Sequence, residues 1–384
     1  MTPRQLRILV VTRSYPSADD LYQYPFVHRR VLAYQAAGHD VAVFRPTGTE
    51  PRTHAFEGVT CHSGDLRSLM SLARDFRADA IAAHGLSETM WPQLAHLPDM
   101  PIRAWLHGSE IPGFFQRKAE LIADASLRAS AMAAMEGPRR FWADLSKVAP
   151  SRLKLVFPSR AAVEMMREDS EPHDYAILPN PIDTDLFHYA PKTAKCRLSI
   201  LSIRPFDSAS YANDLSVRAV LRLSERGDFD KLHFTFIGDG PLFDPTLAPI
   251  AHFHNVEIHR RFLTQSQIAC AHRRHGIFLV PTRLDTQGVS RDEAMASGLV
   301  PVTNRLPVVD EFVDERCAGL ARPEDADDLA DQISLMIANP ALFLRRSAAA
   351  AERIRQTSSH ERVIPSELSL LAQGIGAESN RATS

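Results

Sequence analysis

Short apolar runs alternate with longer segments of helical periodicity along most of the 384-residue chain. Residues 7–11 form the first apolar run, residues 26–37 follow with helical spacing up to Gly38, and residues 39–44 form the next run. This alternation is typical of βαβ units, in which crossover helices join parallel strands. The sequence therefore predicts an α/β fold built on parallel sheets.

The same alternation starts again in the second half, after a proline-containing stretch at residues 179–192 that we interpret as a linker. A chain of 384 residues also exceeds what one hydrophobic core usually supports. We therefore expect two Rossmann-like domains facing across a cleft: residues 1–185, and residues 190–357. A C-terminal helix at about 358–375 is expected to pack back on the first domain, and residues 374–384 to form a polar tail. The predicted strands are 7–11, 39–44, 78–84, 102–107, 153–159, 198–203, 232–237, 276–280 and 300–303; the predicted helices are 26–37, 161–168, 213–226, 292–297, 326–338 and 342–371.

Composition restricts the location and the partners of the protein. Hydrophobic content is 45%, and the formal net charge of -2 gives no overall attraction to nucleic acid or to acidic membranes. Four scattered cysteines fit a reducing compartment and no thiolate zinc pattern. The first apolar run is short for a signal peptide, and no run approaches the roughly 20 residues of a membrane span. We expect a cytoplasmic protein, with the inner face of the plasma membrane as an alternative, and no nucleic-acid partner.

Two further features have residue types that occur in binding sites. Histidines cluster between residues 252 and 275, but their spacing fits no zinc pattern, so we expect no metal. Residues 114–118 and 138–142 mix basic and aromatic side chains. They predict either a solvated helix face or contact with lipid headgroups.

The segment 281–298 carries the most specific pattern. It places two carboxylates, Asp285 and Glu293, on either side of a glycine turn at Gly288 that opens a helix. Such a turn presents backbone N–H groups that suit an anionic phosphate, although the helix dipole adds only about 0.3–2 kcal/mol. A carboxylate in the first helical turn can accept both hydroxyls of a ribose. The residues alone leave open that Asp285 is a turn residue and Glu293 an acid favoured by the dipole.

Residues 293–298, with the sequence E-A-M-A-S-G, resemble the second half of the signature of glycosyltransferase family 4. Members of that family have the GT-B fold and retain the anomeric configuration of the transferred sugar. The resemblance implies that residues 1–185 form the acceptor-side domain and residues 190–357 the nucleotide-sugar donor-binding domain. The resemblance implies that Glu293 binds the donor ribose, and that Gly288, Val289 and Ser290 offer backbone donors to the phosphate and the sugar. Asp285 stands where the family usually has Glu, and it would contact sugar hydroxyls.

Other segments resemble the family in the same order along the chain. Residues 238–241 (G-D-G-P) resemble its G-x-G-P turn and make Gly238 a donor-binding candidate, although a bare GxG is often a plain strand–turn–helix junction. Residues 106–110 (L-H-G-S-E) resemble its H-G-x-D/E loop, which implies that His107 and Glu110 face the donor sugar. Arg204 matches its phosphate-binding arginine.

Residues 179–183 and Phe187 resemble the hinge segment of the family, which has the pattern P-N-G-I/V-D…F. Pro181 replaces the glycine of that pattern. The sequence departs from the family at the second phosphate cation, because residues 205–217 contain no lysine or arginine. Ser210 or Tyr211 stands in that position, and the glycine-rich N-terminal loop of many members is missing as well. Either Arg204 and the helix turn handle the charge alone, or another cation such as Arg13 or Arg291 compensates.

Taken together, these features predict a retaining glycosyltransferase of the hexosyltransferase type, with His107, Asp285 and Arg204 as catalytic residues. It would move a sugar from a nucleotide diphosphate-sugar to a hydroxyl of a capsule or lipopolysaccharide precursor, or to a lipid-linked acceptor, without a metal or another cofactor. Peripheral contact with the membrane is part of this prediction. The alternatives are a GT-B epimerase or inverting transferase, and a catalytically impaired nucleotide-sugar-binding protein. The absence of GxGxxG after the first strand disfavours a nicotinamide dehydrogenase.

Overall fold

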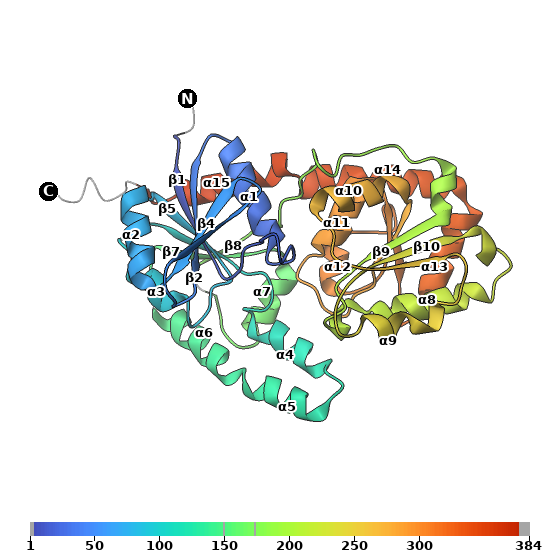
Figure 1. Cartoon of the computed structure of the whole chain (residues 1–384), viewed down its shortest axis with the longest axis horizontal. Helices are drawn as coiled ribbons and strands as arrows, with labels where there is room; N and C mark the ends of the chain where they lie inside the picture. Colours follow the sequence, from blue (N-terminus) through green and yellow to red (C-terminus); the bar gives the residue numbers. More distant parts are fainter. Residues whose placement is uncertain (1–3, 149, 173, 376–384) are drawn as a thin grey trace. The chain divides into compact units, whose positions relative to one another are not determined.

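The computed structural model describes residues 4–148, 150–172 and 174–375, and the chain forms two compact units (Figure 1). Unit 1 comprises the described parts of Met1–Gln116, Ser130–Pro179 and Val363–Ser384. Unit 2 comprises Arg117–Ala129 and Asn180–Arg362. The chain thus passes into unit 2 between Pro179 and Asn180, inside the segment that the sequence indicates as a linker. The predicted polar tail lies almost wholly outside the described residues.

Unit 1 is built on one sheet with the strand order β3-β4-β2-β1-β5-β6-β7-β8 among its described residues. Neighbouring strands are parallel except for β3 and β4, which pair antiparallel. Glu57 and Gly58 connect this pair and both have positive φ, 43° and 82°, as a tight hairpin turn requires. The hairpin was not predicted from the sequence. The strands are β1 (Arg7–Thr12), β2 (Asp40–Pro46), β3 (Arg52–Phe56), β4 (Val59–Gly64), β5 (Ala80–His84), β6 (Ile102–Trp105), β7 (Leu153–Phe157) and β8 (Tyr175–Ile177).

The C-terminal helix α15 (His360–Ala372) packs in the core of unit 1 beside α1 (Figure 1). Its Glu367 is fully buried and accepts hydrogen bonds from Arg30 (3.0 Å) and from the Tyr34 hydroxyl (2.6 Å) on α1. A buried carboxylate needs such partners, because an unpaired charge inside a protein is strongly destabilising. The helices that precede β8 are α1 (Pro25–Ala36), α2 (Leu66–Phe76), α3 (Trp91–Ala95), α4 (Pro112–Glu120), α5 (Ala125–Ala133), α6 (Glu136–Val148) and α7 (Arg160–Arg167). They belong to unit 1, except that the end of α4 and the start of α5 belong to unit 2.

The helical segment predicted over residues 342–371 consists of two helices, and the second of them corresponds to the C-terminal helix expected at about 358–375. Helix α14 (Pro340–Thr357) ends before Ser358, and α15 begins at His360. Between them, Ser359 pairs with Ile182 in an isolated parallel bridge. The backbone N–H of His360 donates to the Ile182 carbonyl (2.9 Å), so tertiary pairing of the backbone interrupts the helix.

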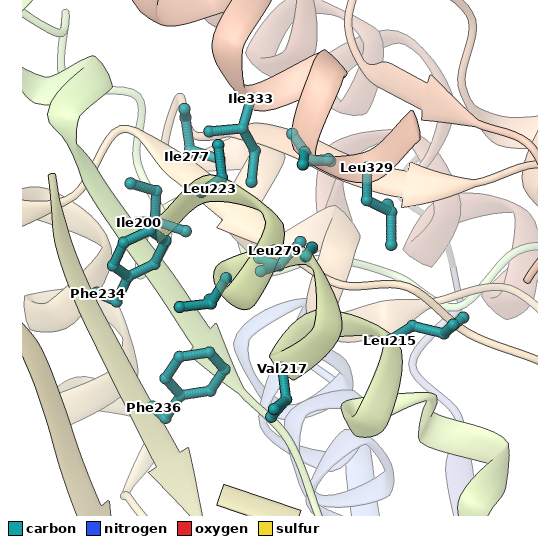
Figure 2. Close-up of a cluster of buried hydrophobic side chains, with 14 of the residues drawn as sticks. Ile200, Leu215, Val217, Leu223, Phe234, Phe236, Ile277, Leu279, Leu329 and Ile333 are labelled. Atoms are coloured by element: carbon teal, nitrogen blue, oxygen red, sulfur yellow. The ribbon is translucent and has the colours of Figure 1, made fainter. Parts of the chain in front are cut away.

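Unit 2 contains a fully parallel sheet with the order β11-β10-β9-β12-β13-β14 among its described residues. Its core consists of aliphatic and aromatic side chains from the sheet and from α8 and α13, shown in Figure 2. The strands are β9 (Ser199–Ile203), β10 (His233–Gly238), β11 (Val256–Arg260), β12 (Ile277–Leu279), β13 (Val300–Asn304) and β14 (Gly319–Ala321). The helices are α8 (Asn213–Ser224), α9 (Phe243–Leu247), α10 (Gln265–Arg274), α11 (Val289–Ala296), α12 (Pro307–Phe312), α13 (Ala326–Ala338) and α14.

The strand order of each sheet reverses at one place. In unit 1 the chain runs from β1 outward to β2 and returns to β5 on the other side of β1. In unit 2 it runs from β9 outward to β10 and β11, and returns to β12 on the other side of β9. Ligands of open parallel sheets bind at the carboxyl ends of the strands at such a switch point. The loops after β1 and β5, and after β9 and β12, are therefore the places to look for sites.

Candidate functional site

The loops after β9 and β12 are joined directly at the switch point of unit 2. The backbone N–H of Arg283 and the hydroxyl of Thr282 both donate to the carbonyl of Ser210, at 2.9 and 3.2 Å. The Arg283 side chain adds paired hydrogen bonds to Asp214 and Glu324, between 2.7 and 2.8 Å. These contacts hold the two loops together. They also pair the positive charge of Arg283 with two carboxylates.

Arg204, at the same edge of the unit 2 sheet, is a buried cation with only part of its guanidinium hydrogen-bonded. It follows β9 and is only 5% exposed, and its Nη1 donates to the Ser290 hydroxyl at 3.2 Å. Its guanidinium carbon lies 4.8 Å from the centre of the Tyr211 ring. The Nε and Nη2 atoms are buried and have no hydrogen-bond partner among the described residues. Burial lowers the pKa of Arg204, whereas the nearby Asp285 carboxylate opposes that shift.

A buried guanidinium with two unpaired nitrogen atoms is unfavourable by itself, because each unpaired buried donor costs about 1–3 kcal/mol. An anion that accepts from both nitrogen atoms would remove this cost. Arg204 therefore has the properties of an anion-binding residue.

Helix α11 begins beside Arg204, at the glycine turn that the sequence indicated. Gly288 is its N-cap with φ 102°, and no side chain caps this end. A Cβ at Gly288 would lie 3.0 Å from the Arg291 guanidinium carbon, so the turn needs glycine both for its conformation and for space. The first backbone N–H groups of a helix have no acceptor within the helix, so those at Val289 and Ser290 suit an anion.

The helix start predicted at residue 292 is wrong by three residues, because α11 begins at Val289. Glu293 consequently lies in the second turn of the helix and not in the first. Its side chain is partly exposed. Binding of a ribose by Glu293 stays a prediction.

Asp285 shapes the loop that precedes this helix. Its Oδ1 accepts hydrogen bonds from the backbone N–H groups of Thr286 (2.8 Å) and Gln287 (3.1 Å). The structure therefore supports the turn role that the residue pattern had left open. A contact between Asp285 and a sugar stays a prediction.

A buried polar network under the loop was missed at the sequence level. Gln287 accepts from the backbone N–H and side chain of Asn180 and donates to Asp292 at 3.0 Å. Arg291 donates to Asp292 at 2.8 Å and to the Gln287 carbonyl at 2.6 Å. Burial raises the pKa of Asp292, and Arg291 counteracts this shift. Because its charge is already paired, the structure does not support Arg291 as a second phosphate cation. The only sequence signal for the network was Asn180 in the hinge-like segment.

The glycines of the G-D-G-P turn allow the Arg204 loop to pass close by. A Cβ at Gly238 would lie 2.0 Å from the carbonyl oxygen of Arg204. Gly240 has φ 141°, and a Cβ there would lie 2.4 Å from the carbonyl carbon of Phe206. Gly238 thus positions Arg204, whereas direct donor binding by Gly238 stays a prediction.

The two predicted residues of the H-G-S-E loop, His107 and Glu110, lie in unit 1, after β6. The Nε2 atom of His107 is 3.0 Å from Nδ1 of His84, which is fully buried at the end of β5. The two imidazole rings are nearly parallel, at 13°. Burial lowers the pKa of both histidines well below the usual range, so the pair is neutral near pH 7. His84 was not recognised from the sequence, because a single histidine at the end of a strand carries no pattern.

Glu110 holds the same loop in place. Its Oε2 accepts from the backbone N–H groups of His107 and Gly108, both at 3.0 Å, and its Oε1 accepts from the Tyr24 hydroxyl at 3.0 Å. The geometry makes Glu110 a residue that positions His107. A contact between Glu110 and the donor stays a prediction.

Several side chains of the basic and aromatic stretches at residues 114–118 and 138–142 make contacts within the protein. Trp142 is 3% exposed and donates from Nε1 to the Glu110 carbonyl at 2.7 Å. Arg139 pairs with Asp169 at 2.7 Å, and Phe114 packs on Gly108. No helix in the described part of the chain is both long and apolar enough for a membrane span. Within residues 4–375, apart from 149 and 173, no group of three or more metal-ligating side chains comes together.

Comparison with known proteins agrees with this architecture. Residues 199–339 match the family model described as glycosyl transferases group 1. Among solved structures, sucrose-phosphate synthase from Thermosynechococcus elongatus superposes with a TM-score of 0.71 at 14% identity, covering 96% of this chain and 98% of that one. A glycosyltransferase from Rickettsia africae gives 0.70 at 11% identity, with coverage of 96% and 98%. An alpha,alpha-trehalose-phosphate synthase (UDP-forming) from Burkholderia vietnamiensis gives 0.67 at 14%, with coverage of 98% and 99%.

The fold is GT-B. These superpositions cover both Rossmann-like domains. The two-domain GT-B architecture expected from the sequence is therefore confirmed. A comparison with curated proteins gives no match. The family match covers the part of unit 2 that holds Arg204 and the turn before α11. It supports a glycosyltransferase.

Proposed function

We propose that the protein transfers a glycosyl group from a nucleotide diphosphate-sugar to a hydroxyl of a surface polysaccharide or glycolipid acceptor. The observation that carries this proposal is Arg204, a buried guanidinium with two unpaired nitrogen atoms at the N-terminus of α11. The match of residues 199–339 to glycosyl transferases group 1 supports a nucleotide diphosphate-sugar as the source of this anion. A diphosphate presents enough acceptor oxygens for Arg204 and for the helix turn at once.

In this proposal the donor lies along the carboxyl edge of the unit 2 sheet. The diphosphate accepts from Arg204 and from the backbone N–H groups of Val289 and Ser290, at about 1.5–3 kcal/mol for each charge-assisted hydrogen bond. Glu293 binds the ribose, and Asp285 with Gly288 contacts the sugar. Arg283 and Arg291 are already paired with carboxylates, so Arg204 and the helix turn take most of the phosphate charge.

The same groups stabilise the leaving group during transfer. As the glycosidic bond breaks, negative charge grows on the diphosphate, and donors that are already positioned stabilise it without reorganisation. The acceptor oxygen bonds to the anomeric carbon on the face that the diphosphate leaves, and the departing phosphate accepts the proton of that hydroxyl. Because attack and departure take place on the same face, the anomeric configuration is retained. A neutral His107, held by His84 and by the Glu110 loop, is a hydrogen-bonding partner for the donor sugar.

No metal or other cofactor has a role in this mechanism. The acceptors that we propose are precursors of capsule or lipopolysaccharide and lipid-linked sugars. We propose the cytoplasm or the inner face of the plasma membrane as the location of the enzyme.

The direct test is incubation of the full chain with a panel of nucleotide diphosphate-sugars, with release of the nucleotide diphosphate as the readout. We expect one donor to be consumed, and Glu293→Ala to weaken binding of the matching nucleotide diphosphate. NMR of the product anomer separates retention from inversion, so an inverted product would favour the inverting alternative. Saturable binding without turnover of any donor would favour an impaired nucleotide-sugar-binding protein, the candidate suggested by the missing second cation.

A further inference from the structure

The strands β10 and β11 present different residues to the two faces of the unit 2 sheet. On β10, Phe234 and Phe236 point into the core that includes α8 (Figure 2). Side chains alternate along a strand, so Thr235 points to the opposite face. Thr235 lies beside Glu257 of β11 in the parallel register, and His259 is two residues further along β11 on the same face. The opposite face of the sheet is therefore polar at its β11 edge.

Helix α10 covers this opposite face only in part, and a pocket of about 460 Å³ remains between the helix and the two strands. We call it the α10 pocket. It is lined by residues of β10, β11 and α10 and by Arg261 and His275, all of which belong to unit 2. None of the donor-site candidates Arg204, Asp285 and Gly288 lines it. A volume in this range is typical of sites for small molecules.

The α10 pocket contains two positive charges without a carboxylate partner. Arg261 follows β11 and Arg274 ends α10, and both are exposed. Neither forms an ion pair among the residues that the structure describes. By contrast, the adjacent Arg260 pairs with Asp239 at 2.9 Å and with Asp244 at 2.6 Å. With one carboxylate in the lining and neutral histidines, the pocket has a formal charge of +1, which favours an anion.

The inner wall of the α10 pocket offers hydrogen-bond acceptors. His275 is 8% exposed; its Nδ1 lies 2.8 Å from the Ala271 carbonyl and its Nε2 lies 3.1 Å from the Thr235 hydroxyl. A carbonyl oxygen only accepts, so Nδ1 carries the proton and donates it. Burial lowers the pKa of His275, so the ring is neutral and Nε2 accepts from Thr235. The Thr235 oxygen and the Glu257 carboxylate can then accept from hydroxyl groups of a ligand.

Two other kinds of ligand do not fit the α10 pocket. A metal ion needs a group of ligating side chains, and no group of three or more comes together within residues 4–148, 150–172 and 174–375. An acidic macromolecule needs a larger basic surface, because its binding depends on several unpaired cations. Next to the pocket the charge of Arg260 is already paired, and the formal net charge of the chain is -2.

We propose that the α10 pocket is a second anion-binding site, and that it binds a small phosphate ester with free hydroxyl groups, such as a sugar phosphate. Arg261 and Arg274 donate to the phosphate, and Thr235 and Glu257 accept from the hydroxyl groups. The proposal goes beyond the proposed glycosyltransferase function and does not depend on it, because the pocket shares none of the donor-site candidates.

The test is isothermal titration of a hexose 6-phosphate and of inorganic phosphate into the full chain. We expect saturable binding of the ester, and binding of inorganic phosphate that is at least about tenfold weaker because it lacks the hydroxyl contacts. The double variant Arg261→Gln/Arg274→Gln should bind the ester at least about tenfold more weakly than the wild type. Both arginines are exposed, so these substitutions leave the core of unit 2 unchanged.

Arg273→Gln is the matched control. Arg273 is the neighbour of Arg274 on α10, is also exposed and does not line the pocket, so its replacement should leave the affinity for the ester unchanged. Glu257→Gln should act in the opposite direction to the double variant. It removes the negative charge of the lining but keeps an acceptor oxygen, and it should strengthen binding of the ester about threefold.

Several results would overturn the proposal. They are no binding of the ester by the wild type, equal affinity in the double variant, inorganic phosphate binding as tight as the ester, or weaker binding in Glu257→Gln. Binding to vesicles of anionic phospholipid that the double variant loses, without binding of the ester, would show a membrane-binding surface and also overturn it.

Arg204→Met separates this site from the donor site. We expect this variant to keep the wild-type affinity for the hexose 6-phosphate, and the double variant to keep the wild-type affinity for nucleotide diphosphates. If Arg204→Met loses the ester, the ester binds at the donor site and the α10 pocket assignment is wrong. If no nucleotide diphosphate binds and the ester still depends on Arg261 and Arg274, the donor assignment is wrong and the α10 pocket stands.

Discussion

Replacing Arg204 with methionine tests whether this residue is present for a ligand and not for the stability of the fold. Methionine keeps an unbranched apolar stem in a buried position and removes the guanidinium. In the free protein, the substitution removes two buried nitrogen atoms without partners, whose cost is about 1–3 kcal/mol each. It also removes the hydrogen bond to Ser290, at about 1.5–3 kcal/mol, and the cation–π contact with Tyr211, at about 0.5–2 kcal/mol.

These gains and losses nearly cancel. We therefore expect Arg204→Met to change the unfolding free energy by less than about 2 kcal/mol, in either direction. For a folding unit of this size, that corresponds to a shift of at most about 4–8 °C in the thermal midpoint. Differential scanning calorimetry of the ligand-free protein measures this shift.

Arg283→Met is the matched control, because Arg283 lies on the same edge of the sheet with its guanidinium bonded to both Asp214 and Glu324. Its removal takes away satisfied contacts and no unpaired ones, so it should lower the midpoint more than Arg204→Met does. A loss of more than about 3 kcal/mol on Arg204→Met, as expected for breaking a satisfied buried ion pair, would refute the reasoning.

Three further predictions concern the surrounding structure. Gly238→Ala should displace the Arg204 backbone and weaken nucleotide diphosphate binding in calorimetric titration, whereas Gly227→Ala, with no atom within 4 Å of the added Cβ, should leave it unchanged. Glu367→Gln removes the carboxylate that pairs with the buried charge of Arg30, and it should lower the unfolding free energy of unit 1 in urea by about 3–5 kcal/mol. A decrease of less than about 1 kcal/mol would contradict a stabilising role of this ion pair. Burial lowers the pKa of His28 to about 4, so between pH 6.5 and 4 the unfolded chain binds more protons than the folded chain. The thermal midpoint should therefore decrease as the pH is lowered from 6.5 to 4, and the decrease should be smaller in His28→Asn.

The regular elements were predictable where one segment carries its own signal. The helix at 326–338 was predicted at the bounds it has, because its apolar spacing is a local feature. The strands β1, β9 and β13 were found because buried parallel strands are continuous apolar runs. The β3–β4 hairpin was missed because its strands are short and half-exposed and its turn depends on Glu57 adopting positive φ.

The candidate site was predictable in the parts that depend on backbone geometry. Gly288 and the helix after it follow from local sequence, and Arg204 was found through the resemblance to the family's phosphate-binding arginine. The partners that hold these residues were not predictable, because they come from distant segments. Asn180 and Gln287 are 107 positions apart, and His84 and His107 are 23 apart. Such polar pairs have no periodicity, and only the folded chain brings them together.

The central claim is that a diphosphate accepts hydrogen bonds from the two unpaired nitrogen atoms of Arg204. Isothermal titration of UDP, GDP, ADP and CDP into the wild type and into Arg204→Met tests it most directly. We predict saturable binding of at least one nucleotide diphosphate by the wild type, weakened at least about 30-fold in the variant, the equivalent of about 2 kcal/mol. Equal affinity in the two proteins, or no binding of any of the four by the wild type, would contradict the account.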